Sequence, residues 1–184
     1  MSGSFDETIE PAGELRINKK EFDQETLDDA LRVDRLCQDI LKHFYLSLQG
    51  EGLSPETATR LAGSADYYVR DFVVDNRVHN LFEERTGLVR QFAGNWYIVN
   101  TLEPSHAEIG LLLRALRLLY RYLGATGVLD PDDARAVAEM LEDGEFFHRR
   151  LEDFWSLTPH DVPAWRAVAE YRKGRSPPAR GDSA

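Results

Sequence analysis

Apolar residues dominate residues 109–123, which read IGLLLRALRLLYRYL. At 100° per residue, the apolar side chains of this segment cover an arc of about 220°. A surface helix shows about half that apolar width, so we expect neighbouring elements to cover this one on two or three sides. Ser105 and Glu108 form an S-x-x-E pattern, which is typical of a capping box at the start of a helix. The segment is therefore predicted to be the central helix of a mainly α-helical protein. Its remaining polar strip consists of Gly110, Arg114, Arg117 and Arg121.

Further helices are predicted on both sides of the central one. Apolar residues recur with a 3.6-residue period from about residue 24 to residue 49, and two glycines follow. On the C-terminal side, Asp-Pro-Asp-Asp at 130–133 is typical of a helix start. Together with later periodic segments it predicts a helical bundle that ends near Lys173. The flanking residues 1–23 and 174–184 are polar and rich in glycine and proline, so they are predicted to be a mobile N-terminal tail and a disordered C-terminal tail.

Residues 53–82 are predicted to form two helices joined by a tight turn. Ser-Pro-Glu at 54–56 suits a helix start, Gly63 stands where the first helix would end, and Ser64 would begin the second. Two helices joined by a glycine-containing turn are typical of a helix-turn-helix motif. Next, residues 88–92 and 96–99 are rich in β-branched and aromatic residues and flank Ala-Gly-Asn, which predicts a β-hairpin.

This order of elements resembles the winged-helix branch of the helix-turn-helix superfamily. Small or apolar residues stand where that family places packing residues, and the resemblance extends over about residues 53–101. Its closest members in character are the acidic winged-helix subunits that bind the kleisin of chromosome-condensation complexes. The resemblance implies a winged-helix-like segment within residues 24–101, followed by helices over residues 102–173. The packing positions are Ala58, Leu61, Ala62, Val69 and Phe72.

Composition narrows the classes of protein that fit. The 184 residues and 42% apolar content suit one domain, and no apolar run is long enough to span a membrane. The N-terminus lacks the basic and apolar regions of a signal peptide, and the single Cys37 cannot form an internal disulfide. We therefore expect a cytoplasmic protein. The net charge of −10 repels phosphate groups, which disfavours nucleic acid as the partner.

The predicted helix at 64–82 carries two apolar stripes. One stripe contains Tyr68, Val69, Phe72 and Val73, and would face the protein's own core. The second stripe is covered either by the same domain or by a partner, because a helix with two apolar stripes must be covered on two sides. As a partner-binding face, the second stripe consists of Tyr67, Val74, Val78 and Leu81.

Arginines supply the candidate contacts to phosphate or to an acidic partner. Arg114, Arg117 and Arg121 align on one helix face, where they can bind an anion or pair with acidic residues of the same chain. In a winged-helix protein, Arg70 and Arg77 would lie near DNA phosphates and Arg90 on the wing.

Metal and cofactor chemistry finds little support. Glu-x-x-His pairs occur at 103–106 and 145–148, as in di-iron helical bundles, which also need glutamates from two further helices. Pro104 and the Ser105 cap place Glu103 outside the helix, and the second pair has no evident partners. We expect no metal and no cofactor.

Three functions remain open. The leading hypothesis is a non-enzymatic adaptor subunit that acts through protein contacts or self-association, within a nucleic-acid-associated complex or elsewhere. The alternatives are a DNA-binding regulator of the winged-helix type and a metal-dependent helical-bundle enzyme.

Overall fold

The computed structural model describes residues 17–83 and 86–169 of the chain. These residues form helices joined by short connections and contain no β-strand, so the mainly α-helical prediction is confirmed. The predicted C-terminal tail lies outside the described residues. The elements are η1 (Lys19–Phe22), α1 (Leu27–Gly50), α2 (Pro55–Asp66), η2 (Tyr67–Asn76), α3 (Thr86–Gln91), η3 (Phe92–Trp96), α4 (Tyr97–Asn100), α5 (His106–Ala125), α6 (Pro131–Glu142), α7 (Gly144–Ser156) and α8 (Val162–Ala169).

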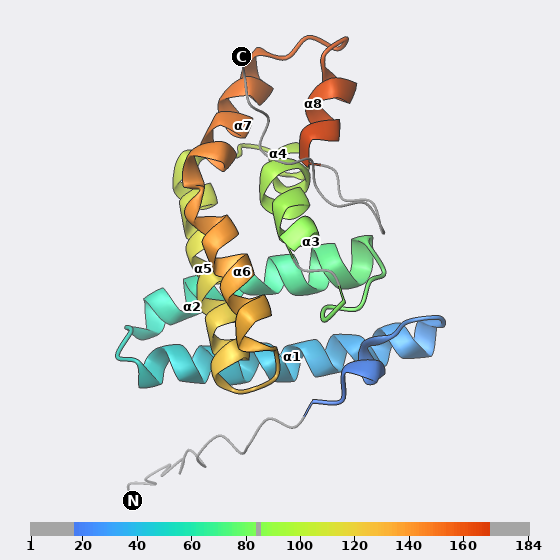
Figure 1. Ribbon diagram of the computed structural model, residues 1–184, viewed down its shortest axis with the longest axis vertical. Coiled ribbons are helices and arrows are strands. Elements are labelled where there is room, and N and C mark those ends of the chain that lie inside the picture. Colours follow the sequence, from blue (N-terminus) through green and yellow to red (C-terminus); the bar gives the residue numbers. More distant parts are fainter. Residues whose placement is uncertain (1–16, 84–85, 170–184) are drawn as a thin grey trace, which may run out of the picture.

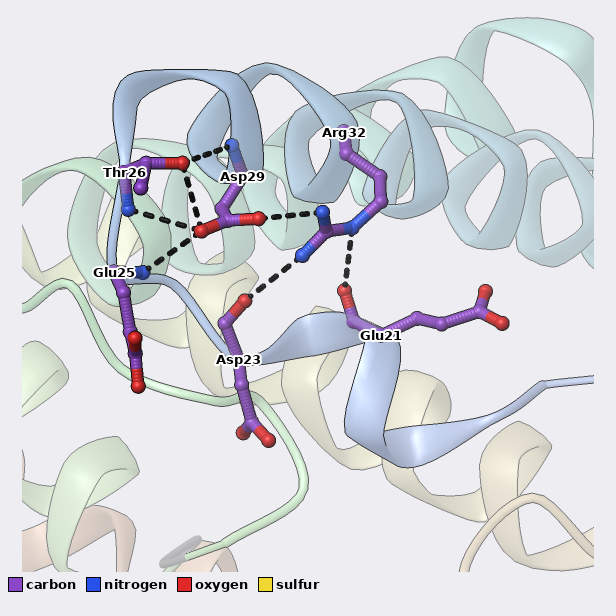
Figure 2. Close-up of polar contacts among 6 residues, drawn as sticks. All are labelled: Glu21, Asp23, Glu25, Thr26, Asp29 and Arg32. Atoms are coloured by element: carbon purple, nitrogen blue, oxygen red, sulfur yellow. Dashed lines mark hydrogen bonds and ion pairs between the residues drawn. The ribbon is translucent and has the colours of Figure 1, made fainter.

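A network of hydrogen bonds stabilises the start of α1 (Figure 2). Thr26 Oγ1 accepts from the Asp29 N–H at 3.2 Å, and the Asp29 carboxylate accepts from the Thr26 N–H at 3.0 Å, which completes a capping box. Arg32 donates to the backbone carbonyls of Glu21 and Asp23 at 3.3 and 3.1 Å. These bonds tie the 3₁₀ helix η1 to α1. The packed body therefore begins before residue 24, where the sequence pattern placed the end of a mobile tail.

Helix α1 and the combined helix α2–η2 lie side by side and run in opposite directions (Figure 1). The helix-turn-helix prediction is wrong at its central point, because the chain stays helical through Gly63. Ser64 Oγ donates to the Arg60 carbonyl within the helix, and the Tyr67 N–H donates to the carbonyls of Gly63 and Ser64. Glycine here lowers helix propensity but does not end the helix, because packing of the flanking apolar residues outweighs that loss.

The predicted β-hairpin at residues 87–101 is also wrong, and with it the winged-helix-like segment. The chain here forms α3, the π-helix η3 and α4. Phe92 and Trp96 lie four residues apart on one helical face, stacked with their ring centroids 5.8 Å apart, and both contact Phe72 of η2. Aromatic and β-branched residues favour strands only when they pack on a sheet, and here a helical cluster buries them.

Gly94 and Asn95, the predicted hairpin turn, serve helix packing. A Cβ added to Gly94 would lie 3.2 Å from Phe146 Cε1 and 3.4 Å from Ala169 Cβ, so glycine lets α7 and α8 approach η3 closely. Asn95 Nδ2 donates to the Arg166 carbonyl of α8 at 3.2 Å.

Helix α5 is the central helix, as predicted, and it contacts α1, α2, α6, α7 and η3. Its polar strip faces outward at Gly110, Arg114, Arg117 and Arg121. Ser105 caps the helix by accepting from the Glu108 N–H at 3.2 Å. The Glu108 carboxylate does not close the capping box; it accepts from the Tyr97 hydroxyl at 2.6 Å. Residues buried on the apolar faces of α5 are Ile109, Leu112, Leu113, Ala115, Leu116, Leu119, Tyr120 and Leu123.

Helices α6, α7 and α8 complete the C-terminal part. Asp130 caps α6 by accepting from the Asp132 N–H at 2.8 Å, as the Asp-Pro-Asp-Asp pattern predicted. None of the helices in the described ranges has the length and apolar content that a membrane crossing requires.

Candidate binding groove between α7 and α8

The predicted partner-binding stripe does not form one exposed face. Val74 and Leu81 are each 2% exposed and belong to the core, while Tyr67 is half-buried and Val78 is 60% exposed. Both apolar stripes of the helix are therefore largely covered within this domain. Val78 has a φ of 49°, so it lies where the chain has already left the helix.

The predicted anion-binding arginines serve different purposes. Arg70 Nε lies 2.6 Å from Asp34 Oδ1 of α1, and its Nη1 lies 3.2 Å from Asp66 Oδ1. These hydrogen bonds raise the pKa of Arg70 against the opposing effect of burial, so this arginine joins η2 to α1. Arg121 pairs with Glu51 at 2.6 Å, as the internal-pairing alternative predicted.

The remaining predicted arginines do not form one basic face with Arg70. Arg90 lies on α3 with its guanidinium carbon 3.7 Å from the centroid of the Phe146 ring of α7. Arg77, Arg114 and Arg117 are exposed, and no ion pair of theirs occurs within residues 17–83 and 86–169.

A groove of about 610 Å³ lies between α7 and α8. Its size falls within the range of small-molecule and peptide side-chain pockets. One wall is apolar and aromatic, and charged residues of both signs stand around it. The lining includes Phe146, Leu157, Trp165 and Val168 on the apolar side and Arg149, Arg150, Asp153 and Asp161 on the charged side.

Arg150 is the most unusual residue of this groove, because it is a charged side chain that is only 4% exposed. Its Nε donates to the Gly94 carbonyl at 2.9 Å, and its guanidinium carbon lies 3.7 Å from the centroid of the Trp165 ring. Its Nη2 is buried and has no hydrogen-bond partner among the described residues, and no carboxylate there lies within ion-pair distance. Buried polar groups are nearly always partnered, so this donor is an exception that needs an explanation.

Burial is the main cause that lowers the pKa of Arg150 to about 10. The Asp153 charge opposes this shift, and the Arg90 charge adds to it. The side chain is therefore still a cation at neutral pH. It is a buried positive charge without a counter-ion in the described part of the chain, an arrangement that is costly unless something compensates it.

The neighbouring elements hold Arg150 firmly in place. Phe147 and Leu151 anchor α7 in the core on either side of it, and the Trp165 indole N–H donates to the Arg150 carbonyl at 3.2 Å. Sequence reasoning missed both Arg150 and Trp165. The sequence signal that could have identified Arg150 is its position on the apolar stripe of α7, in line with Phe147 and Phe154.

A second hollow, of about 490 Å³, lies between α2, α4 and α5. Tyr67, one of the predicted partner-binding residues, lines it. However, its two central polar groups bind each other, since the Tyr97 hydroxyl donates to Glu108 at 2.6 Å. Burial and this carboxylate together raise the pKa of Tyr97. This hollow therefore shows no unmet polar group that would indicate a ligand.

The two Glu-x-x-His pairs do not form a di-iron site. Glu145 is bound to Arg149, and no group of three or more His, Cys, Asp or Glu side chains within the described ranges is arranged to hold a metal ion. The histidines of the two pairs nevertheless meet, with 2.8 Å between His106 Nδ1 and His148 Nδ1.

No protein-family model matches this chain, and neither a curated protein nor a solved structure does so.

Proposed function

We propose that this protein is a non-enzymatic binding subunit that docks a protein partner in the α7–α8 groove. The partner segment places an apolar side chain against Trp165 and Phe146 and a carboxylate near Arg150. The observation that carries this proposal is the buried, incompletely hydrogen-bonded Arg150 cation beside that groove.

The energetics favour such a ligand. Attraction between opposite charges is several times stronger near a buried group than in bulk water, so a carboxylate in the groove would gain from the Arg150 charge. Arginine and tryptophan are also the residue types that most often dominate binding energy at protein interfaces. The apolar wall of the groove is partly covered by water in the free chain, since Val168 is 45% exposed.

Arg150→Met is the decisive variant, because methionine keeps the apolar stem and removes the charge. Peptides selected from a random display library on the full chain should combine an apolar residue with Asp, Glu or a free C-terminal carboxylate. Their affinity should fall at least tenfold in Arg150→Met. The unfolding midpoint of that variant should be equal or higher, since an unpaired buried charge is gone.

The matched control is Arg135→Met, which removes an exposed arginine of α6 that pairs with Asp132 and does not line the groove. It should bind the selected peptides within about twofold of the parent, because an exposed ion pair contributes little. Selected peptides that lack acidic groups, or that bind Arg150→Met as tightly as the parent, would overturn the proposal. So would sedimentation data in which a second copy of the chain occupies the groove.

A further inference from the structure

His106 and His148 come from distant parts of the sequence and meet at the surface. His106 is the first residue of α5 and His148 lies on α7, two helices in contact (Figure 1). Their Nδ1 atoms are 2.8 Å apart, and their ring centroids are 5.0 Å apart at an interplanar angle of 37°. The His106 side chain is 53% exposed, so solvent and ions reach the pair.

We infer that this pair is a binding site for a late first-row divalent transition metal, of which Zn²⁺ is the physiological example. Metal–imidazole bonds of about 2.0–2.1 Å place two nitrogens on one ion roughly 3 Å apart at a right angle and somewhat further apart in a tetrahedron. The 2.8 Å separation is close to that of a right-angled chelate and about half an ångström short of a tetrahedral one. The 5.0 Å between the ring centroids means that the two rings point nearly at each other, so both must turn by roughly 30° to direct their lone pairs at one ion. Without a metal, the same separation accommodates one N–H···N hydrogen bond between the rings.

Glu152 supports the metal-binding tautomer. Its Oε1 lies 3.9 Å from His106 Nε2, the ring nitrogen that does not face His148. A carboxylate there favours a proton on Nε2 and so leaves the lone pair of Nδ1 free for a ligand bond. Orientation of a ligating histidine by a carboxylate at its other nitrogen is a recurrent feature of zinc sites.

The donor set also indicates which ions should bind. Two neutral imidazoles suit Zn²⁺, Ni²⁺ and Cu²⁺ and disfavour Ca²⁺ and Mg²⁺, which take oxygen ligands. Water would complete the coordination, because no third side chain joins the pair in the described ranges. Affinity should therefore follow the order Cu²⁺ above Ni²⁺ and Zn²⁺, with no response to Mg²⁺.

Binding would also stabilise the fold, because it joins the start of α5 to α7. An ion that binds only the folded state raises its stability by mass action. This inference does not depend on the proposed partner groove, since neither histidine lines that groove.

The test is calorimetric titration of the full chain with ZnCl2, CuCl2 and MgCl2, together with thermal unfolding in each ion. We expect one Zn²⁺ per chain, a raised unfolding temperature, and at least a tenfold loss of affinity in His106→Asn and in His148→Asn. Copper-loaded protein should show two nitrogen donors by electron paramagnetic resonance, and one in either variant. His160→Asn is the matched control, because His160 is exposed between α7 and α8 and away from the pair.

The parent's zinc-free unfolding temperature should be nearly preserved in both His variants, which separates lost ligation from lost folding. Absence of Zn²⁺ and Cu²⁺ binding would overturn the inference. Unchanged affinity in both His variants, or an equal loss in His160→Asn, would also overturn it.

Discussion

Helices α5 and α6 pack closely at Gly124, and replacing this glycine by alanine should strain the contact between them. A Cβ added at Gly124 would lie 2.8 Å from the Ala134 Cβ, whereas ordinary contacts between such atoms begin at 3.4 Å. The Ala134 methyl group cannot rotate away, since it is bonded directly to the backbone of α6. The two helices would therefore have to move apart by roughly half an ångström.

The expected magnitude combines two opposing terms. Overpacking of a tight contact costs about 1–3 kcal/mol. Alanine gains up to about 1 kcal/mol over glycine in a helix, and less in the last turn. We therefore expect Gly124→Ala to lower the free energy of unfolding by about 1–2 kcal/mol.

Gly110→Ala is the matched control in the same helix. Gly110 is exposed, and an added Cβ there would meet nothing within 4 Å. It should therefore raise the free energy of unfolding by about 0.5–1 kcal/mol from helix propensity alone. The difference between the two variants isolates the steric contact with α6.

Urea unfolding followed by circular dichroism and tryptophan fluorescence gives both free energies. A second variant, Gly124→Ala with Ala134→Gly, restores the space and should recover more stability than the two single changes predict when added. The reasoning would be refuted if Gly124→Ala stabilised the protein as much as Gly110→Ala does.

Three further predictions concern single groups. Tyr120→Phe removes one hydroxyl of the buried Tyr68–Tyr120 pair, whose oxygens are 2.9 Å apart. It should lower the free energy of unfolding in urea by about 1 kcal/mol. The double variant with Tyr68→Phe should lose less than the sum of the two single losses, because both changes remove the same hydrogen bond. Burial raises the pKa of Cys37 to about 12. A thiol reagent should therefore label Cys37 only as fast as the protein unfolds. Rapid labelling of the native state would contradict its burial. Hydrogen bonds from Thr26 and Arg32 lower the pKa of Asp29 from 3.8 to about 2. The stabilisation of the first turn of α1 by this carboxylate is therefore complete above pH 4 and lost as the pH falls toward 2, which amide hydrogen exchange should show in the parent and not in Asp29→Asn.

Local signals predicted correctly wherever a segment was long and periodic. The apolar width of residues 109–123 identified a helix covered on several sides, and α5 packs against α1, α2, α6 and α7. Cap residues were equally informative, because Ser54, Ser105 and Asp130 each accept from a backbone N–H at the start of a helix. Such signals depend on residues within one turn of each other, so they hold where the flanking residues leave the helix; at Ser64, where packing continues the helix, the same signal was wrong.

The same kind of reasoning failed at residues 63 and 87–101. A glycine disfavours helix, and a β-prone run favours strand, by only about 1 kcal/mol or less. The aromatic cluster of Tyr68, Phe72, Phe92 and Trp96 opposes that preference with several buried rings, and it exists only when η2 and η3 are both helical. The two segments are about 20 residues apart in the chain, so no local pattern could reveal the cluster.

The candidate sites show the same difference between what the sequence determines and what the tertiary structure decides. By itself, the sequence determined the helical class, the central helix and the starts of α2, α5 and α6, since these follow from periodicity and capping. It also contained Arg150 and both Glu-x-x-His pairs, but without their surroundings. Only the tertiary structure decided that Arg150 is buried beneath Trp165 and that the Nδ1 atoms of His106 and His148 are 2.8 Å apart. The reason is physical: burial, charge compensation and metal chelation depend on distances between residues of different helices, and helix packing alone sets those distances.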